Sequence, residues 1–147
     1  MSIDSIGSMI KSIMNNRCTF NDNKHGFTAF NTHNVKWSQI DLNERKVRIV
    51  LDFPVNKYDE AKISQRIDIP TKSSGNKDAW LFVKPASSQD NATHDVVEIT
   101  IKSGYLKRYL ESSGQDLWDF IEELTSISHF KLAPSYGRKI KSSRRPS

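Results

Sequence analysis

The sequence predicts an α+β domain in which an antiparallel meander of about five or six strands follows an N-terminal helix and is closed by one or two C-terminal helices. Apolar residues recur at helical spacing near both ends of the chain and alternate at a period of two through its middle. Strands and helices do not alternate as βαβ units would, which argues against a nucleotide-binding parallel sheet. We expect a single domain over 1–129 and a basic, flexible C-terminal tail over 130–147.

The first expected element is an amphipathic helix over residues 3–14. Its apolar side chains follow i, i+3, i+4, i+7 spacing: Ile3, Ile6, Met9, Ile10, Ile13 and Met14. Ser2 or Asp4 can cap its start. The apolar stripe can pack on the chain's own sheet or on a second copy, so a homodimer is an open alternative.

Six strands are expected to follow, over 27–30, 35–37, 45–53, 61–69, 79–83 and 96–101. Period-two alternation is clearest in 45–53 and 61–69, which predicts half-buried antiparallel strands. The run 79–83 is almost wholly apolar, and we expect it mid-sheet or covered on both faces. A shift of apolar phase between Trp37 and Ile40 predicts a bulge or a strand end there.

The last expected elements are helical and cover 105–110 and 117–127. Residues 113–116 have the pattern of a capping box, which predicts two helices or one helix broken near 112–114. A strand meander closed by a tryptophan-bearing amphipathic helix at 117–124 resembles the plan of pleckstrin-homology-like domains. That resemblance implies an architecture and no function.

Composition restricts the compartment. The single cysteine, Cys18, excludes an internal disulfide framework and fits a reducing compartment. No apolar run approaches the roughly 20 residues of a membrane span, so we predict no membrane insertion. The expected location is the cytoplasm, or the nucleoid or nucleus if the protein binds nucleic acid.

Charge is distributed unevenly along the chain. The net charge is +5, yet residues 1–129 carry 16 basic and 17 acidic side chains, whereas 130–147 carry six basic and none acidic. Cationic arms bind phosphate backbones because each neutralised phosphate releases counterions. Arginine can also donate in a bidentate way to phosphate oxygens, and a tyrosine ring can stack on a base. The expected nucleic-acid-binding residues are Lys131, Tyr136, Arg138, Lys139, Lys141, Arg144 and Arg145.

We therefore predict a non-enzymatic nucleic-acid-binding accessory protein that makes sequence-independent backbone contacts through its cationic arm. The alternative is a protein-interaction module of the inhibitor, immunity or adaptor type, binding an acidic protein partner through the sheet face or the loops 71–78 and 86–95. A tail that only solubilises the chain is a third interpretation. The expected outward charges on the sheet are mixed and predict a solvated surface: Lys46, Arg48, Lys62, Arg66, Lys84 and Lys102 against Asp52, Asp68 and Glu98.

Catalytic and cofactor signatures do not emerge from the sequence. The four histidines, His25, His33, His94 and His129, lack the spacing of a zinc site, so we predict no metal and no cofactor. We name no catalytic residue and lean away from an enzyme. A small hydrolase or nuclease using Asp52, Asp59, Glu60 and Lys62 is the least favoured alternative, since an ordinary charged turn after Pro54 explains that spacing.

Overall fold

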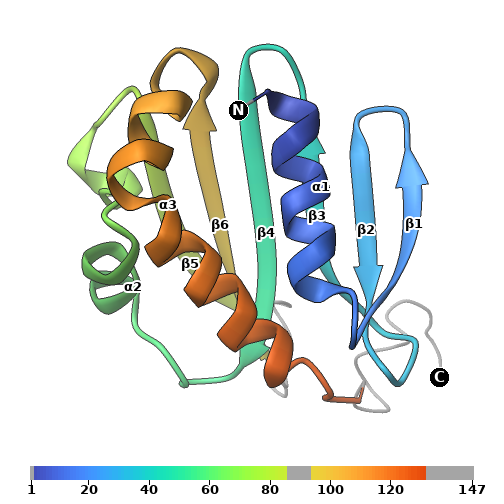
Figure 1. Cartoon of the computed structure of the whole chain (residues 1–147). Helices are drawn as coiled ribbons and strands as arrows, with labels where there is room; N and C mark the ends of the chain where they lie inside the picture. The colour runs from blue at the N-terminus through green and yellow to red at the C-terminus, as the bar shows by residue number, and fades with distance from the viewer. Residues whose placement is uncertain (1, 86–93, 132–147) are drawn as a thin grey trace, which may run out of the picture.

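The computed structural model describes residues 2–85 and 94–131, which form one six-stranded antiparallel sheet with helices on one face (Figure 1). The elements in chain order are α1 (Ile3–Met14), β1 (Thr19–Asn23), β2 (Gly26–Phe30), β3 (Lys36–Leu42), β4 (Lys46–Pro54), α2 (Glu60–Ile67), the 3-10 turn η1 (Lys72–Ser74), β5 (Ala79–Pro85), β6 (His94–Lys102) and α3 (Ser103–Ser126). This arrangement confirms the predicted α+β class.

The strand order is β1-β2-β3-β4-β6-β5, so strands that are consecutive in the chain form a meander only from β1 to β4. The chain then leaves the sheet through α2 and returns at the far edge as β5. β6 fills the place between β4 and β5, pairing with both. The neighbouring strands β4 and β6 are thus separated by about forty residues of sequence but lie side by side along their whole length.

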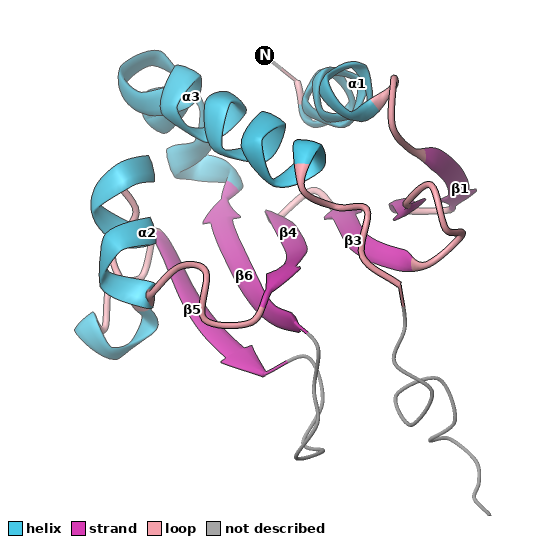
Figure 2. Cartoon of the chain, turned by 90° about the horizontal axis from the view of Figure 1, so that it is seen from below, coloured by secondary structure: helices cyan, strands magenta, loops and turns pink. Residues whose placement is uncertain are grey.

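α1 and α3 cover the same face of the sheet, and Figure 2 shows both helices in one layer above the strands. Alternate residues of β4 point into this layer: Val47, Ile49, Leu51 and Phe53 are each at most 1% exposed. Burying an aliphatic or aromatic side chain of this size stabilises a fold by about 1.5–3 kcal/mol. The core therefore lies between the helices and this one face.

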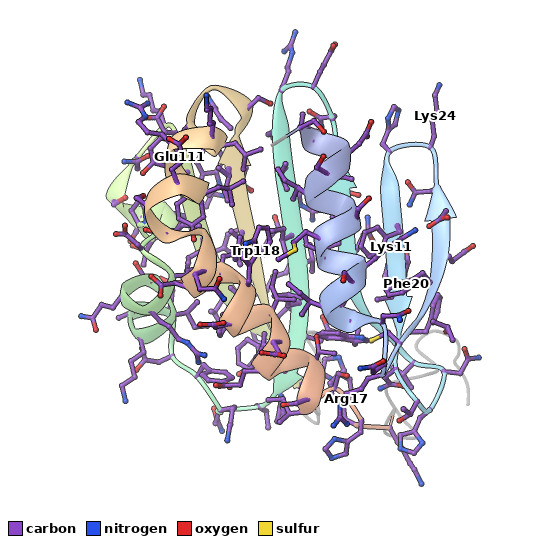
Figure 3. All side chains as sticks on the ribbon, viewed as in Figure 1. Lys11, Arg17, Phe20, Lys24, Glu111 and Trp118 are labelled. Atoms are coloured by element: carbon purple, nitrogen blue, oxygen red, sulfur yellow. The ribbon has the colours of Figure 1, made fainter. Side chains whose placement is uncertain are left out.

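Side chains fix α1 from both sides. Figure 3 shows Trp118 reaching from α3 into the space beside α1, and Lys11 on the side of α1 that faces β1. The Lys11 ammonium lies 2.5 Å from Asp22 Oδ1 on β1 and 5.1 Å from the centre of the Phe27 ring. These contacts connect the first helix both to the last helix and to the β1–β2 hairpin.

Residues 61–69, which we expected to be a strand, form helix α2 and the turn after it. Ile63 and Ile67 stand four residues apart and are both buried, a spacing that suits a helix as well as a strand. The Asp59 carboxylate decides between them because it accepts a hydrogen bond from Lys62 N at 2.9 Å and so caps a helix start. Asp68, with φ of 58°, ends the helix in the left-handed region.

In the first half of the chain, β1 was missed because its residues are polar and exposed apart from the half-buried Phe20. The bulge expected between Trp37 and Ile40 lies at the start of that interval, because Ala29 pairs with Ser38 while Phe30 pairs with Lys36, which leaves Trp37 as the extra residue. β3 itself continues to Leu42, beyond the strand expected over 35–37. Trp37 itself is wholly buried, and its indole N–H donates to Cys18 Sγ at 3.3 Å.

α3 is one continuous helix of 24 residues, without the break expected near 112–114. Of the small residues there, Ser113 joins two elements, because its hydroxyl donates to Asp68 Oδ2 at the end of α2 at 2.8 Å. A Cβ on Gly114 would meet Leu110 Cδ2 of the same helix at 3.4 Å.

β5 is an edge strand and not the central strand that its apolar sequence predicted. Ala79 and Leu81 point into the core, whereas Trp80 and Phe82 are half-buried on the other face. The outer backbone edge of β5 is occupied, because Leu81 N donates to Pro70 O at 3.0 Å and Val83 N donates to Glu60 Oε2 at 2.9 Å. This edge is therefore closed to pairing with another strand at these positions.

Candidate functional site

The second face of the sheet carries no helix in the described part of the chain, and we call it the open face (Figure 2). Strand register places its residues in rows that run across β3, β4, β6 and β5. It comprises Gln39, Asp41, Arg48, Val50, Asp52, Val96, Glu98, Thr100, Trp80, Phe82 and Lys84. Because successive side chains of a strand alternate between faces, these residues lie on the side of the sheet opposite the helices, where Val96 and Thr100 are nevertheless buried.

Arg48 joins three strands on the open face. Its Nη1 donates to Asp41 Oδ2 on β3 at 2.7 Å, and its Nη2 donates to Glu98 Oε1 on β6 at 2.8 Å. The hydrogen bond to Glu98, followed by that to Asp41, raises the pKa of Arg48 above its usual value despite partial burial. One guanidinium thus engages both carboxylates in the middle of this face.

Asp52 pairs with His94 at the end of the open face where β4 finishes and β6 begins. His94 Nε2 lies 3.1 Å from Asp52 Oδ2, and the His94 side chain is fully buried. Burial raises the pKa of Asp52, and the hydrogen bond to His94 offsets this only in part. The acidic groups on this face are therefore engaged by arginine and histidine, and none of them pairs with a lysine within the described residues.

The chain after α3 is anchored at the same end. The Phe130 ring stacks on His94 with a centroid distance of 4.8 Å and an interplanar angle of 19°. Asn31, between β2 and β3, donates its side-chain amide to Phe130 O at 2.7 Å. The last described residue, Lys131, follows directly and is exposed. The expected arm therefore starts from the end of the open face.

Trp80 and Phe82 of β5 stand beside three exposed lysines, and we call these five residues the aromatic–lysine cluster. Lys102 Nζ lies 6.0 Å from the Trp80 ring centre. Lys72 Nζ and Lys84 Nζ lie 4.9 and 5.7 Å from the Phe82 ring centre. Cation–π contacts at exposed sites contribute about 0.5–1 kcal/mol each. Across residues 2–85 and 94–131, none of the three lysines forms an ion pair with an acid.

A hollow of about 360 Å³ lies in the middle of the open face. Val50 and Val96 supply apolar wall, Arg48, Glu98 and Asp52 supply polar wall, and Lys84 stands at its β5 side. Lys84 belongs to the aromatic–lysine cluster as well, so the hollow and the cluster adjoin. The hollow mixes apolar and charged groups.

The predicted arm residues fall mostly beyond the described chain. Lys131 is described, whereas Tyr136, Arg138, Lys139, Lys141, Arg144 and Arg145 lie outside the described residues. The loop 71–78 contains η1, and most of the loop 86–95 also lies outside the described residues. The arm therefore stays a prediction from the sequence.

The six outward basic residues divide between two regions. Lys46, Arg48, Lys84 and Lys102 lie on the open face or at its rim, whereas Lys62 and Arg66 lie on α2. The expectation that these charges cancel holds for Arg48, which pairs with Asp41 and Glu98, and for Arg66, which pairs with Glu123. It does not hold for Lys84 and Lys102 near Trp80 and Phe82. The apolar run Trp80-Leu81-Phe82-Val83 predicts a strand covered on both faces and gives no sign of this cluster.

The carboxylates of the hydrolase alternative serve separate structural contacts. Asp52 pairs with His94, Asp59 caps α2, and Glu60 accepts a hydrogen bond from the β5 backbone. The described chain contains no group of three or more His, Cys, Asp or Glu side chains that could hold a metal ion. His25 and His33 lie in the turns on either side of β2. The structure gives the hydrolase alternative no support.

Comparison with known proteins adds little to this site. No family model matches the chain, and no curated protein matches it. The chain is similar to a crystal structure of YbjN from E. coli, described there as a "putative transcription regulator", with 13% identity and a TM-score of 0.34 over 86% of this chain and 93% of that chain. Similarity at this level carries no argument about fold or function. None of the described helices is both long and apolar enough to cross a membrane.

Proposed function

We propose that this protein is a non-enzymatic nucleic-acid-binding accessory protein whose C-terminal arm makes sequence-independent contacts with the phosphate backbone. One observation carries the proposal: the arm 130–147 has six basic and no acidic side chains, whereas 1–129 has 16 basic and 17 acidic ones. A polyanion gains counterion entropy when such an arm neutralises its phosphates. The body, with its near-zero charge, adds little long-range attraction of its own.

The position of the anchor supports this proposal. Phe130 is held against His94, so the free part of the proposed arm starts no earlier than Lys131. This anchor lies at the end of the open face that carries Lys84 and the hollow. A polyanion bound to the arm would therefore be delivered to the open face rather than to the helix layer.

The test neutralises the arm without shortening the chain. In one variant Arg138, Lys139, Lys141, Arg144 and Arg145 are all changed to glutamine. Binding of this variant and of the unmodified protein to short duplexes of unrelated sequence is measured between about 50 and 200 mM salt. We expect the unmodified protein to bind all sequences alike, with log K falling by about 0.9 per neutralised phosphate for each unit of log salt. The arm variant should lose most of this binding and most of the salt slope.

The matched control removes five positive charges elsewhere. Lys24, Lys57, Lys62, Lys107 and Arg108 are exposed and lie outside the open face, so their change to glutamine alters net charge equally. This control should keep most of the binding. An equal loss of binding in both variants would show that only net charge matters and would contradict the role of the arm. The proposal also fails if the unmodified protein does not bind at moderate salt.

A protein-interaction module that binds an acidic partner remains the second candidate. The hollow favours it, since Val50 and Val96 form an apolar floor between charged groups as small protein interfaces do. Poly-glutamate serves as a test ligand that carries the negative charge expected of an acidic protein partner. Binding that survives arm neutralisation and high salt, and is lost when Val50 is changed to aspartate, would favour this candidate over the nucleic-acid proposal.

A further inference from the structure

We propose that the aromatic–lysine cluster, centred on β5, is a stacking platform for single-stranded nucleic acid. This inference rests on the proposed nucleic-acid function and specifies which form of nucleic acid the folded body selects. The observation behind it is the placement of two ring faces and three lysines without acid partners, within the described residues, on one edge of an uncovered sheet face.

The rings occupy positions where a half-buried strand ordinarily carries polar side chains. Ala79 and Leu81 fill the core side of β5, so Trp80 and Phe82 are not needed to close the core and remain half-buried. The other two tryptophans behave differently, because Trp37 is 0% and Trp118 is 8% exposed. Trp80 is thus the tryptophan whose ring is available to a ligand among the described residues.

The spacing of the rings suits bases that have left a duplex. Residues i and i+2 of a strand lie about 6.7 Å apart. Successive bases of a continuous stack are only about 3.4 Å apart, half the distance between the two ring-bearing residues. The two rings therefore match bases that have been separated from one another. Bases inside a duplex cannot present their faces to a sheet, whereas single strands stack readily on aromatic side chains. The geometry therefore favours a single strand.

The lysines supply the charge that a single strand needs. Lys72, Lys84 and Lys102 have no acidic partner in the described chain, and their ammonium groups now rest against the rings. A lysine side chain is long and rotatable, so its ammonium can leave the ring for a phosphate when a base takes its place. Arg48 cannot do the same without giving up Asp41 and Glu98.

The closed edge of β5 argues against an alternative use of this strand. Edge strands commonly recruit an extended peptide through free backbone groups. Here Leu81 N and Val83 N already donate to Pro70 O and Glu60 Oε2. Recognition at β5 therefore depends on side chains above the sheet, which is the mode that base stacking uses.

The experiment uses the full-length chain, with a single strand of about 15 thymidines and a duplex of about 15 base pairs as probes. Trp80→Leu, Phe82→Leu and the double variant remove the ring faces but keep apolar bulk, and circular dichroism verifies that each is folded. We expect the single strand to quench tryptophan fluorescence in the unmodified protein and not in Trp80→Leu. The double variant should bind the single strand at least about tenfold more weakly and the duplex within about twofold of the unmodified protein.

Lysine variants separate stacking from charge. Lys84→Gln and Lys102→Gln should each lower the salt slope for the single strand by about 0.7. Lys107→Gln on α3 removes an exposed charge from the opposite side of the sheet and is the matched control. An equal effect of Lys107→Gln would overturn the assignment of these lysines to the platform.

The outcomes distinguish the platform from the broader function. If both probes bind, both depend on the arm, and the leucine variants change neither, the platform is overturned and the proposed function stands. If neither probe binds the unmodified protein at moderate salt, the proposed function fails and the platform fails with it. Quenching of Trp80 by poly-glutamate in place of the single strand would overturn the platform in favour of an acidic protein partner.

Discussion

The two faces of this sheet are built from the same strands yet have opposite characters. On β4, Val47, Ile49, Leu51 and Phe53 are buried under the helices, while the alternating residues Arg48, Val50 and Asp52 stay half-buried on the open face. The helix face is apolar and holds the fold together. The open face holds paired charges, a hollow and two aromatic rings.

This contrast separates stability from recognition within single strands. A change at an odd-numbered position of β4 alters the core, whereas a change at an even-numbered one alters a surface. The open face can therefore vary in chemistry while the fold persists. Substitutions on the two faces give direct ways to test whether this separation is real.

The largest difference should appear between two neighbouring residues of β4. Ile49→Ala removes a side chain that is 1% exposed and should lower the free energy of unfolding by about 2–5 kcal/mol. Val50→Ala, on the open face, should lower it by less than about 1 kcal/mol. Urea unfolding measures both. A similar loss of unfolding free energy in both variants would mean that the open face is covered as well, and it would contradict the difference proposed between the two faces.

A smaller effect is expected where the helix layer contains a polar group. The Tyr109 hydroxyl is buried and donates to Ile67 O at 2.6 Å, joining α3 to α2. Tyr109→Phe keeps the ring but leaves this carbonyl without its donor, which should cost about 1–2 kcal/mol. Thermal unfolding compares it with Tyr105→Phe, whose ring is half-buried. Equal, negligible effects would show that α2 is held by apolar packing alone.

The smallest effects should be pH-dependent and of opposite sign on the two sides of the sheet. Burial raises the pKa of Asp52, so its contribution to stability is present below the unfolded pKa of about 3.9 and is lost as pH rises through the folded value. Asp52→Asn should therefore lose less stability than the unmodified protein as pH rises from about 4 toward neutrality. Urea unfolding across this range measures the difference.

Glu123 on α3 provides the reverse case. Hydrogen bonds from Arg66 and then Tyr58 lower the pKa of Glu123. Its contribution is therefore present above the unfolded pKa of about 4.3 and is lost as pH falls through the folded value. Glu123→Gln should be less stable than the unmodified protein near neutrality and converge with it in acid. The Glu123 side chain is 42% exposed, so the difference should be small. Parallel pH profiles for Glu123→Gln and the unmodified protein would contradict this assignment.

The sequence predicted those elements whose local pattern allows only one interpretation. The alternation in 45–53 and the stripe in 3–14 identified β4 and α1 correctly. Residues 61–69 were ambiguous, because Ile63 and Ile67 satisfy both a strand and a helix and only the Asp59 cap settles the choice. β1 was missed because an exposed edge strand has no apolar period to detect.

The site depended on contacts that the sequence does not encode locally. Lys84 and Lys102 were expected to point outward and do so. That Arg48 would engage Glu98, fifty residues away, depends on β6 lying next to β4. That Trp80 and Phe82 would meet solvent depends on β5 lying at the edge, and an apolar run gives no sign of whether it is central or peripheral.

The insertion of β6 between β4 and β5 has a consequence for synthesis of the chain. A ribosome releases residues in order, so Ala79–Pro85 emerges before His94–Lys102, the strand on which it pairs. Until β6 arrives, Trp80 and Phe82 belong to a segment without a sheet neighbour. Nascent chains halted after Pro85 should therefore aggregate or bind chaperones more than chains halted after Lys102. Release of the seventeen residues 86–102 should lower this tendency.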